Sequence, residues 1–235
     1  MVSQLSLSAS VMRAFARLAS DLQRVLGGRF VALVAFSPSE SMAFAETILA
    51  DDLEALSAVA GAWHGDGLAT PLLLTPQEFQ RTLDVFPLEY QAILDQHVVI
   101  AGRPPFDNAA VAHEDLRRAC EAQARSHLIH LRQGWLQAGA HDEHLAELIE
   151  RSAAPFHTLL AHVARLEDGA GSGQSSPDDL ARFAERSIGM PVDLARAIFE
   201  IEARPERRRE LAGRMADYLA ATERLWQLVD RWRPR

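Results

Sequence analysis

Two pairs of histidines stand three residues apart, His127 with His130 and His141 with His144. On a helix this spacing places two imidazoles on one face, and imidazole nitrogen is a common ligand of zinc and related metals. Neither pair has a third ligand at a characteristic spacing, and the HExxH motif is absent. We therefore interpret His127 as a packed residue beside an apolar helix stripe, and the second pair as solvent-facing near a turn at Gly139.

All 24 basic residues are arginine, which excludes chemistry that needs a lysine amine, such as Schiff-base formation. A bound phosphate would have to meet arginine or backbone amides. Arg118, Arg125 and Arg132 are seven residues apart and form one ridge on a predicted helix. Glu114 and Glu121 stand four residues before the first two and are expected to pair with them. Arg132 is then left to contact a phosphate, although a solvent-facing or interdomain role is favoured for the ridge.

Three polar side chains follow the apolar run 30–36. Ser37 and Ser39 come directly after this run, where hydroxyl groups at a strand end could contact phosphate, but the same residues are typical of an ordinary turn. Glu46 follows on the next predicted strand and is the carboxylate best placed there to hold a divalent cation. The simpler interpretation of Glu46 is a solvated residue near the end of a strand.

The composition predicts a conventional folded protein. Its 235 residues are 48% hydrophobic and 24% charged, which suits one large domain or two modest ones. Because Cys120 is the single cysteine, an intrachain disulfide and a CxxC pair are excluded, and the sequence fits a reducing compartment. Cys120 lies on the inner stripe of a predicted helix. The longest apolar run is far shorter than the roughly 20 residues of a membrane helix. We expect a cytoplasmic protein that does not bind membranes.

Negative charge is concentrated in the first half of the chain. Residues 1–110 contain 6 arginines and 12 acidic residues, whereas residues 111–235 contain 18 and 20. An acidic surface repels polyanions at long range unless a metal ion intervenes. General nucleic-acid binding is therefore not expected.

Apolar spacing and turn residues predict alternating helices and strands before residue 107. The predicted helices cover 10–26, about 51–63 and 75–83, and the predicted strands cover 29–36, 42–49, 71–74 and 97–102. Asp51 or Asp52 is expected to cap the second helix, and the Thr75-Pro76-Gln77-Glu78 segment begins the third with a capping box. Residues 86–90 fit neither class. The alternation indicates a mixed or parallel sheet.

After residue 107 the pattern becomes helical. Helices are predicted over 114–137, 142–166 with a kink or break at Pro155, 177–188 and 211–232, and the Gly/Ser-rich segment 168–176 is expected to be a flexible loop. The last helix has apolar residues at alternating four- and three-residue steps: Met215, Tyr218, Thr222, Leu225, Val229 and Trp232. This seam is typical of a helix that lies along another. It predicts packing within a bundle, or against a protein partner or a second copy.

Several blocks give a family resemblance. The segments PLLLT (71–75), FPLEY (86–90) and RRACEAQARSHL (117–128), with His97 and Gly102, are similar to bacterial proteins classed as nucleotidyltransferase-like. In that family a domain of the polymerase-β type precedes a helical domain. The resemblance implies an α+β fold, with a nucleotidyltransferase-like mixed sheet and helices over 1–107 and an all-α helical bundle over 108–235.

The catalytic motif of that family is degenerate here. An active member ends its first strand in Gly-Ser and places two aspartates one residue apart on the next strand, so that both carboxylates share a face and hold Mg²⁺. This chain has Phe36-Ser37 at the first position, and Met42 and Phe44 at the second. Thioether and phenyl groups do not bind Mg²⁺, which takes oxygen ligands. The resemblance therefore implies a fold that has lost its catalytic residues.

Two functions remain open at this point. The first is a catalytically inactive protein with no cofactor that acts through protein contacts or weak ligand binding. The alternative is an active enzyme that transfers a nucleoside monophosphate from a metal-bound nucleoside triphosphate, with Mg²⁺ held at a rearranged site by Glu46. Under either function, Ser37, Ser39 and Arg132 are the candidates for nucleotide contact, and the sequence indicates no catalytic residue.

Overall fold

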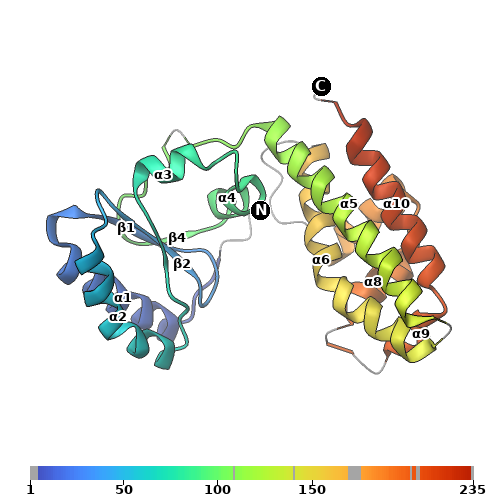
Figure 1. Cartoon of the computed structure of the whole chain (residues 1–235), viewed down its shortest axis with the longest axis horizontal. Coiled ribbons are helices and arrows are strands. Elements are labelled where there is room, and N and C mark those ends of the chain that lie inside the picture. The colour runs from blue at the N-terminus through green and yellow to red at the C-terminus, as the bar shows by residue number, and fades with distance from the viewer. Residues whose placement is uncertain are drawn as a thin grey trace. The chain divides into compact units, whose positions relative to one another are not determined.

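The fold is given by a computed structural model that describes residues 5–107, 109–139, 141–168, 176–201, 203–204 and 207–233. The described residues form two compact units, divided between Ala112 and His113. All the strands belong to the first unit, and the second is built from helices (Figure 1). The predicted α+β class is confirmed. Apart from its two end residues, the predicted flexible loop 168–176 lies outside the described residues.

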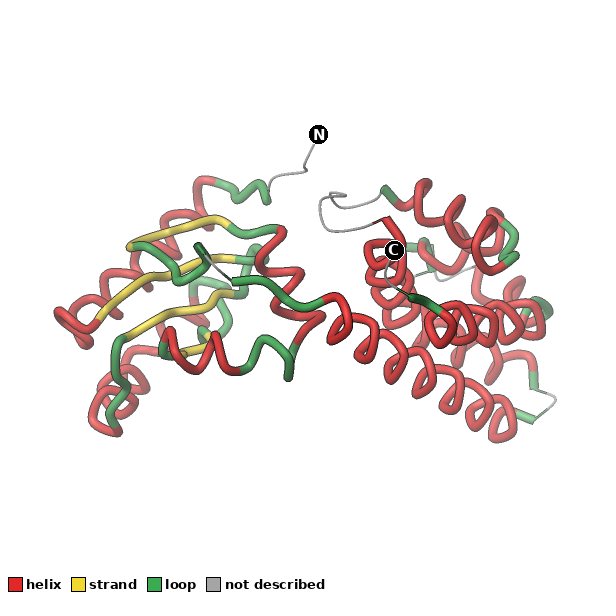
Figure 2. The backbone as a smooth tube through the Cα atoms, turned by 90° about the horizontal axis from the view of Figure 1, so that it is seen from above, coloured by secondary structure: helices red, strands yellow, loops and turns green. Residues whose placement is uncertain are grey.

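The first unit is built on a four-stranded mixed sheet. Its strands are β1 (Phe30–Ala35), β2 (Ser41–Ala45), β3 (Leu72–Leu74) and β4 (Val98–Gly102), which lie side by side in the order β3-β2-β1-β4 (Figure 2). Strand β1 is antiparallel to β2 and β4, while β2 and β3 are parallel. Because β1 and β2 are central and covered on both faces, their sequences are almost continuously apolar.

Helices cover both faces of this sheet. Helices α1 (Ala9–Leu26) and α2 (Ala50–Gly65) lie side by side on one face, and α3 (Pro76–Arg81) and α4 (Pro87–Asp95) lie on the other (Figure 1). The hydroxyl of Ser8 accepts a hydrogen bond from the Val11 amide at the start of α1, and Gly27, with φ of 57°, ends it. A short 3-10 helix, η1 (Gly27–Arg29), leads into β1. The inner face of α1 packs against the sheet through Phe15, Leu18 and Leu22.

The structure corrects two expectations in the first unit and assigns one segment that had none. Strand β2 ends at Ala45 rather than near residue 49, and α2 begins at Ala50, so neither Asp51 nor Asp52 is the N-cap residue. Residues 86–90, which had no assignment, contain the beginning of α4, with Pro87 at its first position. Proline suits that position because its missing amide hydrogen would be unpaired there in any case.

An ion pair replaces the expected cap of α2. Both guanidinium nitrogens of Arg29 donate to the Asp52 carboxylate, at 2.6 and 2.7 Å, and the Leu49 amide donates to the same carboxylate at 2.8 Å. The Arg29 hydrogen bonds, followed by the Leu49 hydrogen bond, lower the pKa of Asp52 to about 2. Asp52 thus caps the helix from inside its first turn and joins it to the beginning of β1.

The second unit contains six helices in its described residues: α5 (His113–Ala138), α6 (Asp142–Asp168), α7 (Pro177–Ile188), α8 (Val192–Phe199), α9 (Arg208–Ala212) and α10 (Met215–Arg231). Helix α5 lies along α6 and α10 (Figure 1). The predictions for α5 and α7 are confirmed within one residue, whereas α8 and α9 were not predicted. Helix α6 continues through Pro155 without a break, and α10 begins after Gly213 rather than at Leu211.

The predicted seam of α10 packs inside its own unit. The buried seam residues are Met215, Tyr218, Thr222, Leu225 and Val229. Trp232 follows the helix and stacks parallel to the His113 ring, with 6.4 Å between ring centroids. These five buried residues are therefore not accessible to a second copy or a protein partner.

Gly102 permits a close approach between two strands. It has φ of 72°, and a Cβ atom at this position would lie 2.0 Å from the Val31 carbonyl oxygen. We expect Gly102→Ala to destabilise the first unit by more than about 2 kcal/mol, because backbone strain and main-chain overlap add together. Gly67→Ala is the matched control, since Gly67 has φ of 82° but no neighbouring atom within 4 Å. Equal losses of unfolding free energy in urea for the two variants would contradict this explanation.

Candidate functional site

Met42 and Phe44, the positions at which the resemblance implies catalytic aspartates, lie in a packed apolar layer. Met42 and Phe44 are both 0% exposed. The Phe44 ring meets Phe79 of α3 and Phe106 edge to face, with centroid distances of 5.5 and 5.8 Å. Phe79 packs in turn against Tyr90 of α4 at 4.9 Å. Phe44, Phe79, Tyr90 and Phe106 form an aromatic cluster that joins the sheet to α3 and α4.

This aromatic cluster stabilises the fold and offers no ligand to a hard cation. Edge-to-face ring pairs contribute about 0.5–1.5 kcal/mol each beyond the burial of their area. Mg²⁺ requires oxygen donors and retains several waters, which need space as well as carboxylates. At Met42 and Phe44 that space is filled by side chains in contact with their neighbours.

The two candidate serines belong to the turn between β1 and β2. The Ser37 hydroxyl accepts hydrogen bonds from the amides of Ser39, at 3.3 Å, and Glu40, at 2.9 Å. The Phe36 amide donates to the Glu40 carbonyl at 3.1 Å, and the Ser39 carbonyl accepts from Ala69 at 2.8 Å. The Ser37 hydroxyl is thus engaged by its own turn, as in common serine turns.

Glu46 lies beyond the end of β2. It would share a strand face with Met42 and Phe44 only if the strand continued through residue 46, and β2 ends at Ala45. Its side chain is exposed, and its amide donates to the Arg29 carbonyl at 2.8 Å. Within the described ranges, no group of three or more His, Cys, Asp and Glu residues is arranged to hold a metal ion.

The predicted ion pairs along α5, Glu114 with Arg118 and Glu121 with Arg125, are wrong. Glu114 and Glu121 both bind Arg117, at 2.8 and 2.7 Å. Arg118 pairs instead with Asp115. The Arg117 side chain is only 15% exposed, and it stands three residues after one glutamate and four before the other. A half-buried arginine between two glutamates attracts both carboxylates. Neither glutamate therefore pairs with an arginine of the exposed ridge.

The rest of the arginine ridge ties α5 to α10. The Arg125 guanidinium lies over the Trp226 ring, 4.9 Å from its centroid, which is cation–π geometry. Arg132 donates to the Glu223 carboxylate at 3.1 Å. The arginine that the sequence left for a phosphate therefore holds a carboxylate of its own unit.

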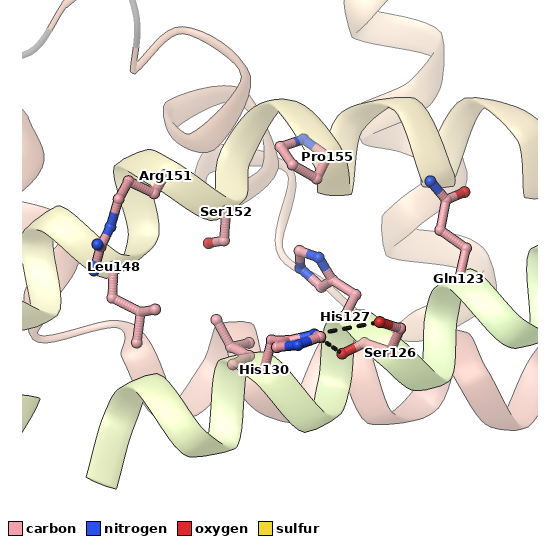
Figure 3. Close-up of a pocket in the computed structure, with 9 residues that line it drawn as sticks. Gln123, Ser126, His127, His130, Leu148, Arg151, Ser152 and Pro155 are labelled. Atoms are coloured by element: carbon pink, nitrogen blue, oxygen red, sulfur yellow. Dashed lines mark hydrogen bonds between the residues drawn. The ribbon is translucent and has the colours of Figure 1, made fainter. Parts of the chain in front are cut away.

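A pocket of about 350 Å³ lies between α5 and α6 (Figure 3). Helix α5 contributes Ser126, His127 and His130, and α6 contributes Arg151 and Pro155. A proline inside a helix has no amide hydrogen to bond the carbonyl four residues earlier, and its ring crowds that carbonyl. In α6 that carbonyl belongs to Arg151, so this main-chain hydrogen bond is missing where the helix borders the pocket.

His127 and His130 both line this pocket but have different partners. Nε2 of His127 lies 3.1 Å from the Tyr218 hydroxyl, which donates to the Ser152 carbonyl at 3.3 Å. Burial, with a smaller contribution from His130, lowers the pKa of His127 to about 4. Nδ1 of His130 donates to the Ser126 carbonyl at 2.8 Å. His127 is therefore a neutral, packed histidine, and His130 is turned toward its own helix.

The remaining reactive side chains have ordinary surroundings. His141 and His144 are exposed at the beginning of α6, with their ring centroids 5.3 Å apart. Cys120 is buried on α5, and burial raises the pKa of its thiol to about 12. A thiol with so high a pKa is a poor nucleophile at neutral pH.

Neither a protein-family model, nor a curated protein, nor a solved structure matches this chain. The resemblance to nucleotidyltransferase-like proteins thus rests on the sequence blocks alone. Among the described residues, no helix is long and apolar enough to cross a bilayer.

Sequence reasoning identified His127 and His130 but missed the pocket that they line. Gln123, Leu148 and Arg151 also line it, and no motif marks them. Their convergence depends on how α6 packs on α5, so a pattern within either helix gives no sign of it.

Two buried histidines should make the second unit sensitive to acid. Burial is the main cause that lowers the pKa of both His127 and His162 from 6.5 to about 4. Below pH 6.5 the unfolded chain takes up protons that the folded unit resists, so stability falls progressively between pH 6.5 and 4. We expect a loss of about 2 kcal/mol per histidine at pH 5 relative to pH 7.5.

Urea unfolding of the intact chain at the two pH values measures this loss. His127→Gln should remove about 2 kcal/mol of the pH-dependent part. His141→Gln, at an exposed position, should leave it unchanged. Equal stability of the second unit at pH 7.5 and pH 5 would disprove the assignment.

Proposed function

We propose that this chain is a catalytically inactive nucleotidyltransferase-like protein that acts by binding a protein partner or, weakly, a small ligand. The observation that carries the proposal is the full burial of Met42 and of Phe44, whose ring is part of the aromatic cluster. In the resembling family, metal-binding aspartates occupy the matching positions. A side chain that ligates a metal must reach the metal, and these two are enclosed by apolar neighbours.

The charge distribution supports a non-catalytic role. Residues 1–110 carry 12 acidic residues against 6 arginines. Without a bound cation, this half of the chain repels a triphosphate rather than attracting it. The arginine candidate from the second unit, Arg132, is paired with Glu223. We also propose a cytoplasmic location, which the single buried thiol of Cys120 supports, and no general nucleic-acid binding.

Exposed apolar side chains support binding as the mode of action. Leu53 of α2 is 52% exposed and lines a second pocket, of about 310 Å³, together with Leu56, Trp63 and Leu73. Leu72, on the neighbouring edge strand β3, is 51% exposed. Apolar side chains beside an unpaired strand edge are suited to contact with another polypeptide.

A nucleotide-transfer assay tests the proposal. We expect no transfer of label from Mg-ATP, Mg-CTP or Mg-GTP to protein or added acceptors, because the reacting phosphates would lack a metal site. We also expect no metal-dependent rise in melting temperature with any of these nucleotides, since a ligand stabilises only the state that binds it.

The alternative function makes the opposite prediction. Transfer that disappears in Glu46→Ala but persists in Glu40→Ala, an exposed glutamate on the preceding turn, would replace our proposal with an active transferase that uses a rearranged metal site.

A further inference from the structure

Arg151 is the charged residue that distinguishes the α5–α6 pocket. Its side chain extends from α6 toward Leu148 at one end of the pocket (Figure 3). Glu147 stands four residues earlier, a spacing that often forms ion pairs, yet no ion pair or hydrogen bond links Arg151 to any described side chain. The neighbouring Glu150 binds Arg208 at 3.4 Å instead. The Arg151 guanidinium is therefore available to an incoming acid.

The described residues that line this pocket include no carboxylate. Although the chain has a net charge of −8, this lining does not oppose the entry of an anion locally. A single guanidinium matches the charge and the paired oxygens of one carboxylate. A phosphate monoester carries close to two negative charges and would leave one of them uncompensated.

Gln123 stands at the opposite end from Arg151 (Figure 3). Its Oε1 atom is buried and has no hydrogen-bond partner among the described residues. A buried acceptor without a partner is destabilising, and rotation of the amide would present this oxygen to a donor in the pocket. The site thus favours a ligand with a hydrogen-bond donor at the end opposite its acid group.

Apolar side chains supply the walls between these two ends. Leu131 of α5 and Leu148 and Pro155 of α6 line the pocket. Its volume of about 350 Å³ is near the lower end of ligand sites, which favours a small molecule.

We propose that the α5–α6 pocket binds a small organic acid with an apolar body, whose carboxylate contacts Arg151 and whose far end donates a hydrogen bond to Gln123. This pocket lies entirely within the second unit. The proposal therefore stands independently of the absence of metal chemistry in the first unit, and either can fail without the other.

Isothermal titration of the full chain with 4-hydroxyphenylacetate tests this proposal, because this compound has an acid, an aromatic body and a distal hydroxyl donor. We expect saturable one-to-one binding. Phenylacetate, which lacks the donor, should bind several-fold more weakly, and the uncharged 4-hydroxyphenylacetamide should bind about tenfold more weakly or worse.

Variants assign these effects to residues. Arg151→Gln should weaken binding of the acid about tenfold while leaving the amide almost unaffected. Gln123→Leu should abolish the difference between 4-hydroxyphenylacetate and phenylacetate. Arg132→Gln is the matched control, because this arginine lies on α5 outside the pocket and contacts Glu223. Circular dichroism and thermal unfolding verify that each variant is folded.

Three results would overturn the proposal. They are the absence of saturable binding at millimolar 4-hydroxyphenylacetate, equal affinity for the acid and its amide, and unchanged affinity in folded Arg151→Gln.

Discussion

The edge-to-face packing of Phe44 against Phe79 and Phe106 is the contact on which the first unit depends. It joins the central strand β2 to α3 and to the segment after β4, and thereby closes one face of the sheet. The opposite face is closed by α1 and α2. A carboxylate could not occupy position 44 in this arrangement, because its charge would be buried among rings without a partner. The same packing stabilises the unit and leaves no place for a metal-binding carboxylate at position 44.

In the second unit, Tyr218 has the structural role that Phe44 has in the first. Its fully buried ring meets Phe156 of α6 edge to face at 5.1 Å, and its hydroxyl lies between His127 of α5 and the Ser152 carbonyl of α6. One side chain of α10 thus fixes two other helices at the level of the α5–α6 pocket. Because burial, with a smaller contribution from His130, lowers the pKa of His127 to about 4, the pocket combines an uncharged histidine with the charged Arg151 at one end.

The sequence predicted those elements whose signals are local. Helix α1 has a serine cap, an apolar stripe and a glycine stop, and α7 has a serine cap, a first-turn proline and Gly189 in the left-handed region. Elements whose limits depend on distant residues were missed. Strand β2 is short, and α2 begins where it does because Arg29 reaches Asp52, a pairing across 23 positions that periodicity does not reveal. Helix α4 was missed because its nine residues are too few to show a clear helical periodicity.

For the candidate site too, some features were predictable from the sequence and others only from the fold. The sequence alone showed that positions 42 and 44 hold apolar residues, and that such residues do not bind Mg²⁺. That Ser37 serves its own turn and that Arg132 meets Glu223 became evident only from the fold. The expected pairing of Glu114 and Glu121 failed because spacing alone does not show that Arg117 is half-buried between them. The α5–α6 pocket had no sequence signal, since it is made by the packing of two helices.

The central claim is that apolar side chains occupy the place of metal-binding carboxylates on β2. Paramagnetic broadening of methionine methyl NMR signals by Mn²⁺ and ATP tests it most directly, because Met42 lies at one of those positions and Met12, which is 37% exposed, reports non-specific contact. We predict that the Met42 methyl signal keeps its intensity at stoichiometric Mn²⁺. Selective loss of the Met42 signal, with Met12 unaffected, would contradict the account.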